Sequence, residues 1–85
     1  MKILWSEKAW EDYLYWQHND LGILEKINAL VKDTQRNPFK GIGKPEPLKH
    51  ELKGYWSRRI TGEHRLVYKV TDEQIVIASC NYHYE

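Results

Sequence analysis

The sequence predicts an α+β fold: a short N-terminal strand, then a helical hairpin packed on a twisted antiparallel sheet of four or five strands. Two observations lead to this fold class. Apolar residues recur at helical spacing in two segments before residue 37, and three strand-like stretches follow residue 54. Two helices against one antiparallel sheet form a layered arrangement. A chain of 85 residues has room for one small core, so we expect residues 1–85 to form a single domain.

The first expected elements are a strand at residues 2–5 and a helix that begins after Ser6. Ser6 can cap the helix N-terminus, and Glu7 places a negative charge in the first turn, where it interacts favourably with the helix dipole. The residues expected on the buried face of this helix recur at helical spacing: Trp10, Tyr13, Leu14 and Gln17.

The second helix is expected between two breaks in this pattern. Asn19-Asp20 ends the first helix, and the Asp20 carboxylate can cap the second. Asn37-Pro38 ends the second helix, because the residue before a proline disfavours helical angles. The apolar stripe expected on the second helix is Ile23, Leu24, Ile27, Leu30 and Val31.

The rest of the chain is predicted to be a loop followed by strands. Glycine and proline recur through residues 39–54 and favour a loop there. Within this segment only residues 48–52 could hold a short strand. Three strands are expected near residues 55–61, 65–70 and 74–82. The first two form a hairpin, whose register decides which side chains share a face.

Two registers are open to this hairpin. A two-residue turn would pair Ile60 with Arg65 and place the arginine on the apolar face. A three-residue loop, residues 62–64, pairs Thr61 with Arg65 and places Arg59 and Arg65 on the opposite face. We expect the three-residue loop, because burying an unpaired guanidinium is very costly and a slip of one residue exchanges the two faces. The expected core face of the hairpin is Trp56, Ile60, Leu66, Tyr68 and Val70.

The sequence of the last strand does not decide which of its faces is buried, because the odd- and the even-numbered residues of 75–78 are all apolar. If its odd-numbered residues share the face of Arg65, then Asn81 and His83 lie there too. This placement is a hypothesis.

The net charge of +1 hides a strong asymmetry along the chain. Residues 1–39 carry a balance of −1, residues 40–69 a balance of +5, and residues 70–85 a balance of −3. Solvated lysine and arginine side chains explain any single cation, but clustered positive charge attracts a polyanion. The partner is expected to be anionic.

The basic segment and the C-terminus contain the groups that RNA cleavage without a metal requires. The 2′-hydroxyl attacks the neighbouring phosphorus, so a base, fixed cations and an acid are needed. Glu46 is the candidate base, Arg65 and Arg59 are the candidate phosphate-binding cations, and His83 is the candidate acid. The reference pKa of histidine, about 6.5, suits that acid role. Tyr84 could stack on a base.

Each assignment has a structural alternative. Glu46 stands between two prolines and could be an exposed loop residue. His83 could belong to a frayed terminus, and Arg65 could be a surface cation or an ion-pair partner of Glu63.

Several other classes of protein find no support in the sequence. Cys80 is the single cysteine, so an internal disulfide is excluded and a reducing cytoplasm is the expected location. No signal peptide or membrane helix is expected. His18, His50 and His64 lack metal-ligand spacing, and no phosphate-binding glycine motif is present, so no metal or cofactor is expected.

Two sequence blocks, residues 43–49 (Gly-Lys-Pro-Glu-Pro-Leu-Lys) and residues 56–60 (Trp-Ser-Arg-Arg-Ile), carry a resemblance to a known family. Further matches lie at residues 5–7, 13–16, 37–39, 64–68 and 82–84. On these residues the chain resembles the YoeB family of bacterial toxins, within the RelE-like ribonuclease superfamily, over essentially its full length.

The resemblance implies the toxin of a type II toxin–antitoxin pair, an mRNA interferase that cleaves mRNA in the ribosomal A site and so inhibits translation. The implied reaction is metal-independent and leaves a cyclic or 3′ phosphate. Carried over by position, Glu46 would be the general base, His83 the general acid and Arg65 the residue that stabilises the scissile phosphate.

The resemblance also implies supporting residues and partners. Lys49 and Arg59 would assist at the phosphate, and Tyr84 would orient the nucleotide. A homodimer and neutralisation by a YefM-type antitoxin are implied as well. Glu85 departs from the family pattern, because it follows the usual terminal tyrosine and adds a negative charge beside His83.

Two other functions remain open at this point. The chain could be a non-catalytic binding module, as are the ParE-like toxins of the same fold that act on DNA gyrase. It could also be an interaction protein whose basic face holds an acidic antitoxin. The combination of Glu46, Arg65 and His83 favours the ribonuclease.

Overall fold

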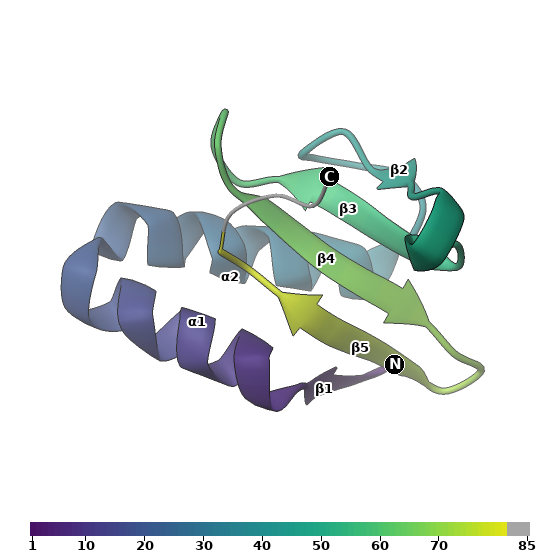
Figure 1. Cartoon of the computed structure of the whole chain (residues 1–85), viewed down its shortest axis with the longest axis horizontal. Coiled ribbons are helices and arrows are strands. Elements are labelled where there is room, and N and C mark those ends of the chain that lie inside the picture. The colour runs from purple at the N-terminus through teal and green to yellow at the C-terminus, as the bar shows by residue number, and fades with distance from the viewer. Residues whose placement is uncertain (82–85) are drawn as a thin grey trace.

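A computed structural model describes residues 1–81, which form two helices and a five-stranded sheet (Figure 1). In chain order the elements are β1 (Lys2–Trp5), α1 (Glu7–Asn19), α2 (Leu21–Arg36), β2 (Glu46–Pro47), the 3-10 turn η1 (His50–Leu52), β3 (Tyr55–Arg59), β4 (Arg65–Val70) and β5 (Gln74–Ser79). This is the predicted α+β arrangement.

The helices begin and end at the predicted capping residues. The Ser6 hydroxyl accepts a hydrogen bond from the Ala9 amide at 3.0 Å. Asp20 closes α1 and caps α2, where its carboxylate accepts from the Ile23 amide at 3.1 Å. Asn37 ends α2 as predicted. The Ser6 and Asp20 side chains each bind a backbone donor that a helix N-terminus leaves without a partner.

The buried face of α1 differs from the prediction. Trp10 is 48% exposed and Gln17 is also exposed, whereas Trp16 is only 6% exposed. The face turned to the core is Ala9, Asp12 and Trp16. Two tertiary bonds fix it, because the Asp12 carboxylate accepts from the Cys80 amide at 3.0 Å and the Trp16 indole donates to the Cys80 carbonyl at 2.8 Å. The stripe predicted for α2 is confirmed, with Ile27 and Leu30 fully buried.

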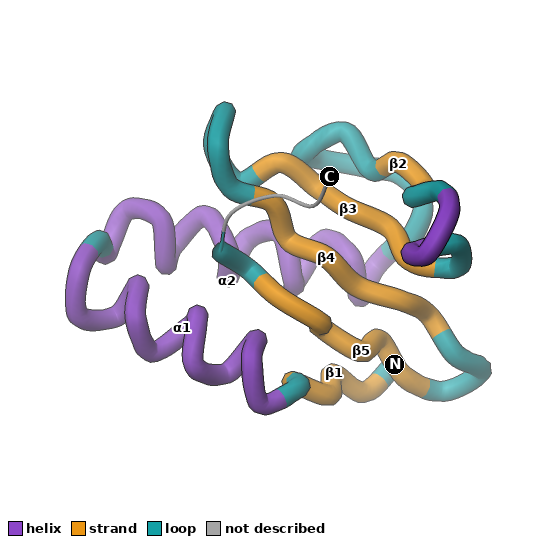
Figure 2. Tube along the Cα trace, viewed as in Figure 1, coloured by secondary structure: helices purple, strands orange, loops and turns teal. Residues whose placement is uncertain are grey.

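The strand order in the sheet is β1-β5-β4-β3-β2, so the first strand pairs with the last (Figure 2). β2, β3, β4 and β5 are antiparallel as expected, but β1 pairs with β5 in parallel, which makes the sheet mixed. β2 is formed by Glu46–Pro47. Residues 48–52, which could have held a short strand, contain η1 instead, and the short strand of this segment is β2, just before them.

The register of the β3–β4 hairpin keeps the predicted faces but differs by two residues. Arg59 pairs with Arg65, and Ser57 pairs with Val67. The predicted pairing of Thr61 with Arg65 was therefore wrong, and the connecting loop is longer. Because the observed register differs from the predicted one by an even number of residues, every side chain stays on its predicted face. The two arginines become direct cross-strand neighbours, which the predicted register would not have given.

A bulge in β5 decides which residues of the last strand face the helices. Tyr68 pairs with Ile77, but Val67 pairs with Ser79, so Ala78 is the extra residue. Ile77 therefore faces the helices, whereas Ser79 faces the same side as Arg65. The hypothesis that odd-numbered residues share the face of Arg65 is thus wrong for Ile77, before the bulge, and correct for Ser79, after it. The Ser6 hydroxyl donates to the Ala78 carbonyl at 2.9 Å, which binds the carbonyl of the bulged residue.

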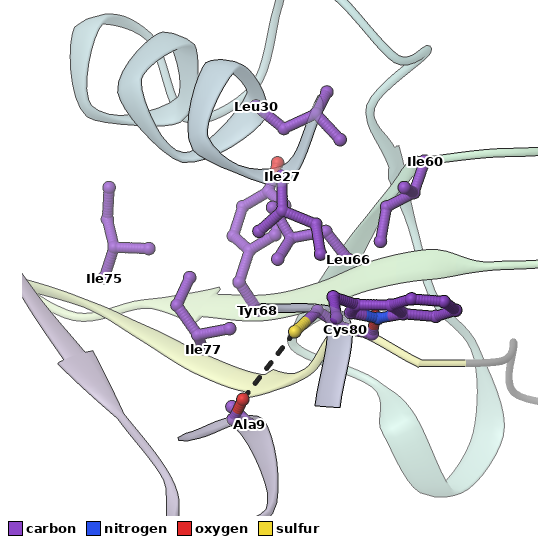
Figure 3. Packing of buried hydrophobic residues seen from close by; sticks show 10 residues of the cluster. Ala9, Ile27, Leu30, Ile60, Leu66, Tyr68, Ile75, Ile77 and Cys80 are labelled. Atoms are coloured by element: carbon purple, nitrogen blue, oxygen red, sulfur yellow. Dashed lines mark hydrogen bonds between the residues drawn. The ribbon is translucent and has the colours of Figure 1, made fainter. Parts of the chain in front are cut away.

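The hydrophobic core lies between the helices and one face of the sheet (Figure 3). Tyr68, Leu66, Ile75 and Ile77 contribute from the strands and are fully buried. Further members are Ala9, Trp16, Ile27, Leu30, Ile60 and Cys80. Arg58, which the sequence reasoning did not place in the core, lies on this face with an exposed fraction of 0%.

Cys80 is expected to be chemically inert in the folded protein. Burial raises the pKa of its thiol to about 12, and the nearby Asp12 carboxylate acts in the same direction. Because the thiolate is the reactive form, native protein should not react with iodoacetamide near pH 8. Mass spectrometry should show one labelled cysteine after unfolding in guanidinium chloride. Labelling of the native protein at the rate of the unfolded chain would contradict this packing.

Candidate functional site

The sheet face opposite the helices carries a row of residues that crosses four strands. Glu46 on β2 pairs with Ser57 on β3, Ser57 with Val67 on β4, and Val67 with Ser79 on β5. Residues paired directly across strands point to the same face. Glu46 is therefore an exposed carboxylate at one end of a row whose other members are small and buried.

Rows of longer side chains flank this row of small ones on both sides. Arg59 and Arg65 form one flanking pair, and Tyr55 and Lys69 form the other. The Lys69 ammonium lies 5.5 Å from the centre of the Tyr55 ring. The buried row of Ser57, Val67 and Ser79 therefore lies between two pairs of longer side chains, which together contribute the cations Arg59, Arg65 and Lys69.

The Arg59–Arg65 pair concentrates positive charge next to Glu46. Arg59 is exposed, whereas Arg65 is partly buried and its Nη1 donates to the Thr61 carbonyl at 3.0 Å. Like charges directly opposite each other across strands are destabilising. An anion bound between the two guanidinium groups would relieve this repulsion.

Among the described residues, Glu46 forms no ion pair with Arg59 or Arg65. Nor does Arg65 pair with Glu63, because the Glu63 carboxylate lies 3.2 Å from His64 Nε2 instead. The carboxylate and the two guanidinium groups thus share a face without forming an ion pair with one another.

Two backbone bonds hold the short strand that carries Glu46. The Arg59 amide donates to the Gly43 carbonyl at 2.7 Å, and the Leu48 amide donates to the Tyr55 carbonyl at 2.8 Å. Lys49, also predicted at the site, follows β2 as an exposed residue at the start of η1. The loop carboxylate predicted from sequence is therefore part of the sheet edge.

The other predicted site residues, His83 and Tyr84, lie outside the described residues. Asn81, at the end of the described chain, has a buried side-chain oxygen without a hydrogen-bond partner among residues 1–81. Sequence reasoning missed Ser57 and Ser79 as members of this face. The alternation in β3 could have identified Ser57, but Ser79 reaches the face only through the bulge.

Within residues 1–81, no cluster of three or more histidine, cysteine, aspartate or glutamate side chains could hold a metal ion. Neither described helix has the length and apolar character needed to cross a membrane.

Comparison with known proteins identifies the family of this chain. Residues 5–84 match the family model described as the YoeB-like toxin of bacterial type II toxin–antitoxin systems. The chain is 67% identical over 84 residues to the toxin YoeB of Escherichia coli strain K12, covering 99% of this chain and all of that protein.

Solved structures agree with this match. The YoeB dimer from Staphylococcus aureus superposes with a TM-score of 0.92 at 56% identity, covering 99% of this chain and 98% of that one. The heterotetrameric YoeB–YefM toxin–antitoxin complex from the same organism gives a TM-score of 0.90 at 56% identity and the same coverage. The chain therefore belongs to the YoeB-like toxins of bacterial type II toxin–antitoxin systems.

Proposed function

We propose that this toxin is a metal-independent endoribonuclease that cleaves mRNA in the ribosomal A site and thereby stops translation. The observation that carries the proposal is the common face of Glu46, Arg59 and Arg65. One carboxylate beside two guanidinium groups that form no ion pair within residues 1–81 provides a proton acceptor next to a binding position for a phosphate.

In the proposed reaction, the Glu46 carboxylate accepts the proton of the ribose 2′-hydroxyl. The 2′-oxygen then forms a bond to the adjacent phosphorus, and the bond from phosphorus to the 5′-oxygen breaks. Arg65, assisted by Arg59, stabilises the negative charge that develops on the phosphorane oxygens. The products are a 2′,3′-cyclic phosphate and a free 5′-hydroxyl.

The remaining roles follow from the family resemblance. His83 donates a proton to the departing 5′-oxygen, and Tyr84 orients the nucleotide. Lys49 contacts the RNA backbone near β2, where it lies three residues beyond Glu46. The ribosome supplies the rest of the substrate geometry, which places the site of action in the cytoplasm.

Two partners are proposed from the relatives. The S. aureus protein forms a dimer and also a heterotetrameric complex with YefM. We infer that this chain likewise forms a homodimer and binds a YefM-type antitoxin, whose acidic residues would complement the +5 balance of residues 40–69.

Sequencing of RNA ends on a translated message tests the cleavage directly. With ribosomes present, we expect new 5′ ends at the A-site codon; with the same message and no ribosomes, we expect few. A message that stays intact under both conditions, while the protein still arrests growth, would refute the ribonuclease and favour a non-catalytic module acting on another target such as gyrase.

The salt dependence of RNA binding tests the phosphate contacts. Arg59→Gln and Lys49→Gln should each weaken binding of a 2′-deoxy-blocked oligoribonucleotide and reduce the slope of log K against log salt by about 0.7, the value for one contact to single-stranded nucleic acid. Lys32→Gln, an exposed position on α2, is the control and should leave the slope unchanged. An unaltered slope for Arg59→Gln would remove Arg59 from the phosphate site.

A further inference from the structure

Arg58 is the largest fully buried side chain of the described residues, although it is adjacent to the exposed Arg59. Alternation along β3 sends Arg58 to the helix side of the sheet, opposite the face of Glu46. A buried guanidinium is tolerated only when its donors are bonded.

All five N–H donors of Arg58 have an acceptor. Nε donates to the Tyr68 hydroxyl at 3.2 Å. Nη1 donates to Asp33 Oδ2 at 2.7 Å and to the Ile42 carbonyl at 3.1 Å. Nη2 donates to the carbonyls of Asn37 at 2.7 Å and Lys40 at 3.1 Å. Three of the five acceptors are therefore backbone carbonyls of residues 37–42.

Tyr68 and Asp33, which accept hydrogen bonds from Arg58, also bind the backbone of residues 37–42 themselves. The Tyr68 hydroxyl donates to the Pro38 carbonyl at 2.6 Å. Asp33 accepts from the Ile42 amide at 3.0 Å, and its hydrogen bond to Arg58 lowers the pKa of its carboxyl. The arrangement is tight, because a Cβ at Gly41, where φ is +129°, would overlap the Asp33 carboxylate.

Residues 37–42 lead directly into the strand that carries Glu46. The next residue, Gly43, adopts φ +79°, and its carbonyl accepts from the Arg59 amide at 2.7 Å. Glu46 follows three residues later in register with Ser57. A two-residue strand has few bonds of its own, so the conformation of the preceding segment decides where it lies.

We propose that Arg58 is a positioning residue for Glu46: by binding residues 37–42 it fixes β2 against β3 and holds the Glu46 carboxylate on the Arg59–Arg65 face. The proposal rests on the proposed function, in which Glu46 is the base. Arg58 itself does not meet RNA, because it lies on the helix side of the sheet. The planar fork is essential to this role; a lysine has three donors and cannot reach five acceptors.

Steady-state cleavage of ribosome-bound message separates positioning from general stability. We expect Arg58→Lys to lower kcat about 10–100-fold with KM changed less than about threefold, since a displaced catalytic group costs rate rather than binding. Amide hydrogen exchange of residues 42–48 should accelerate in the same variant. The control is Ile77→Val or Ile77→Ala on β5, whichever melts nearest to Arg58→Lys, and its kcat should match the parent.

A double variant distinguishes failure of this proposal from failure of the proposed function. If Arg58 acts through Glu46, adding Arg58→Lys to Glu46→Gln should slow cleavage little further; full multiplication of the two losses would overturn the positioning role. Parent-like kcat in Arg58→Lys, with Glu46→Gln slow, also overturns it. Parent-like cleavage by Glu46→Gln instead refutes the base and, with it, both proposals.

Tyr68→Phe keeps the proposal testable if Arg58→Lys does not fold. This change removes the hydroxyl that binds Pro38 and accepts from Arg58, but it retains the buried ring. The same loss of kcat without a comparable rise in KM is expected. Unchanged kcat together with unchanged amide exchange at residues 42–48 would contradict the proposal.

Discussion

Glu46→Gln should lower the cleavage rate on ribosome-bound message by about 10²–10⁴-fold, the usual contribution of a general base. The amide has nearly the same size and remains in the exposed position on β2, but it cannot accept the proton of the 2′-hydroxyl. Growth arrest on expression without an antitoxin should be lost in parallel. Rapid quenching and sequencing of RNA ends measure the rate, and KM should change little.

The matched control for this change is Glu51→Gln. Glu51 is an exposed carboxylate of η1, five residues further along, and loses the same charge. Its cleavage rate should equal that of the parent. If Glu46→Gln, Arg65→Ala and His83→Gln all remain as toxic as the parent, general acid–base cleavage is wrong and the protein acts by binding alone.

Arg58→Met should produce the largest loss of stability of any single change at this sheet, about 3–5 kcal/mol. The methionine fills part of the volume but leaves the carbonyls of residues 37, 40 and 42 without their donor. Small domains have only about 5–15 kcal/mol of stability, so this variant should be close to unfolding at physiological temperature. Urea titration at fixed protein concentration measures the free energy of unfolding.

Arg59→Met is the control for that experiment, because it changes the adjacent residue in the same strand. Its side chain is exposed and lies beside the like-charged Arg65. We expect a change within about 0.5 kcal/mol, as for surface substitutions without buried partners. Equal destabilisation by the two changes would show that charge on β3, rather than the bonds of Arg58, decides the stability.

Features decided by neighbouring residues could be predicted from the sequence. Ser6 and Asp20 were identified as helix boundaries by their capping side chains and Asn37 by the proline that follows it, and the structure confirms all three. The location of Glu46 near the arginines was predicted from chemistry, and the register places Glu46 on their face. His83 and Tyr84 remain predictions.

Features decided by distant residues could not be predicted in the same way. Trp10 and Trp16 are equally apolar, and the hydrogen bonds of Trp16 and Asp12 to the distant Cys80 backbone favour burial of the Trp16 face of α1. The rule against burying an unpaired arginine could not place Arg58 in the core, since the carbonyls that pair it come from a loop whose position the sequence does not give.

The contact between Ser6 and Ala78 joins positions 72 residues apart. β1 has no neighbour in the sheet until β5 has been synthesised. Closing so long a span is slow relative to the local pairing of helices and hairpins. During translation β1 must therefore stay without a partner strand while both helices and β2, β3 and β4 are synthesised, and the sheet can close only after residues 74–79 have emerged from the ribosome.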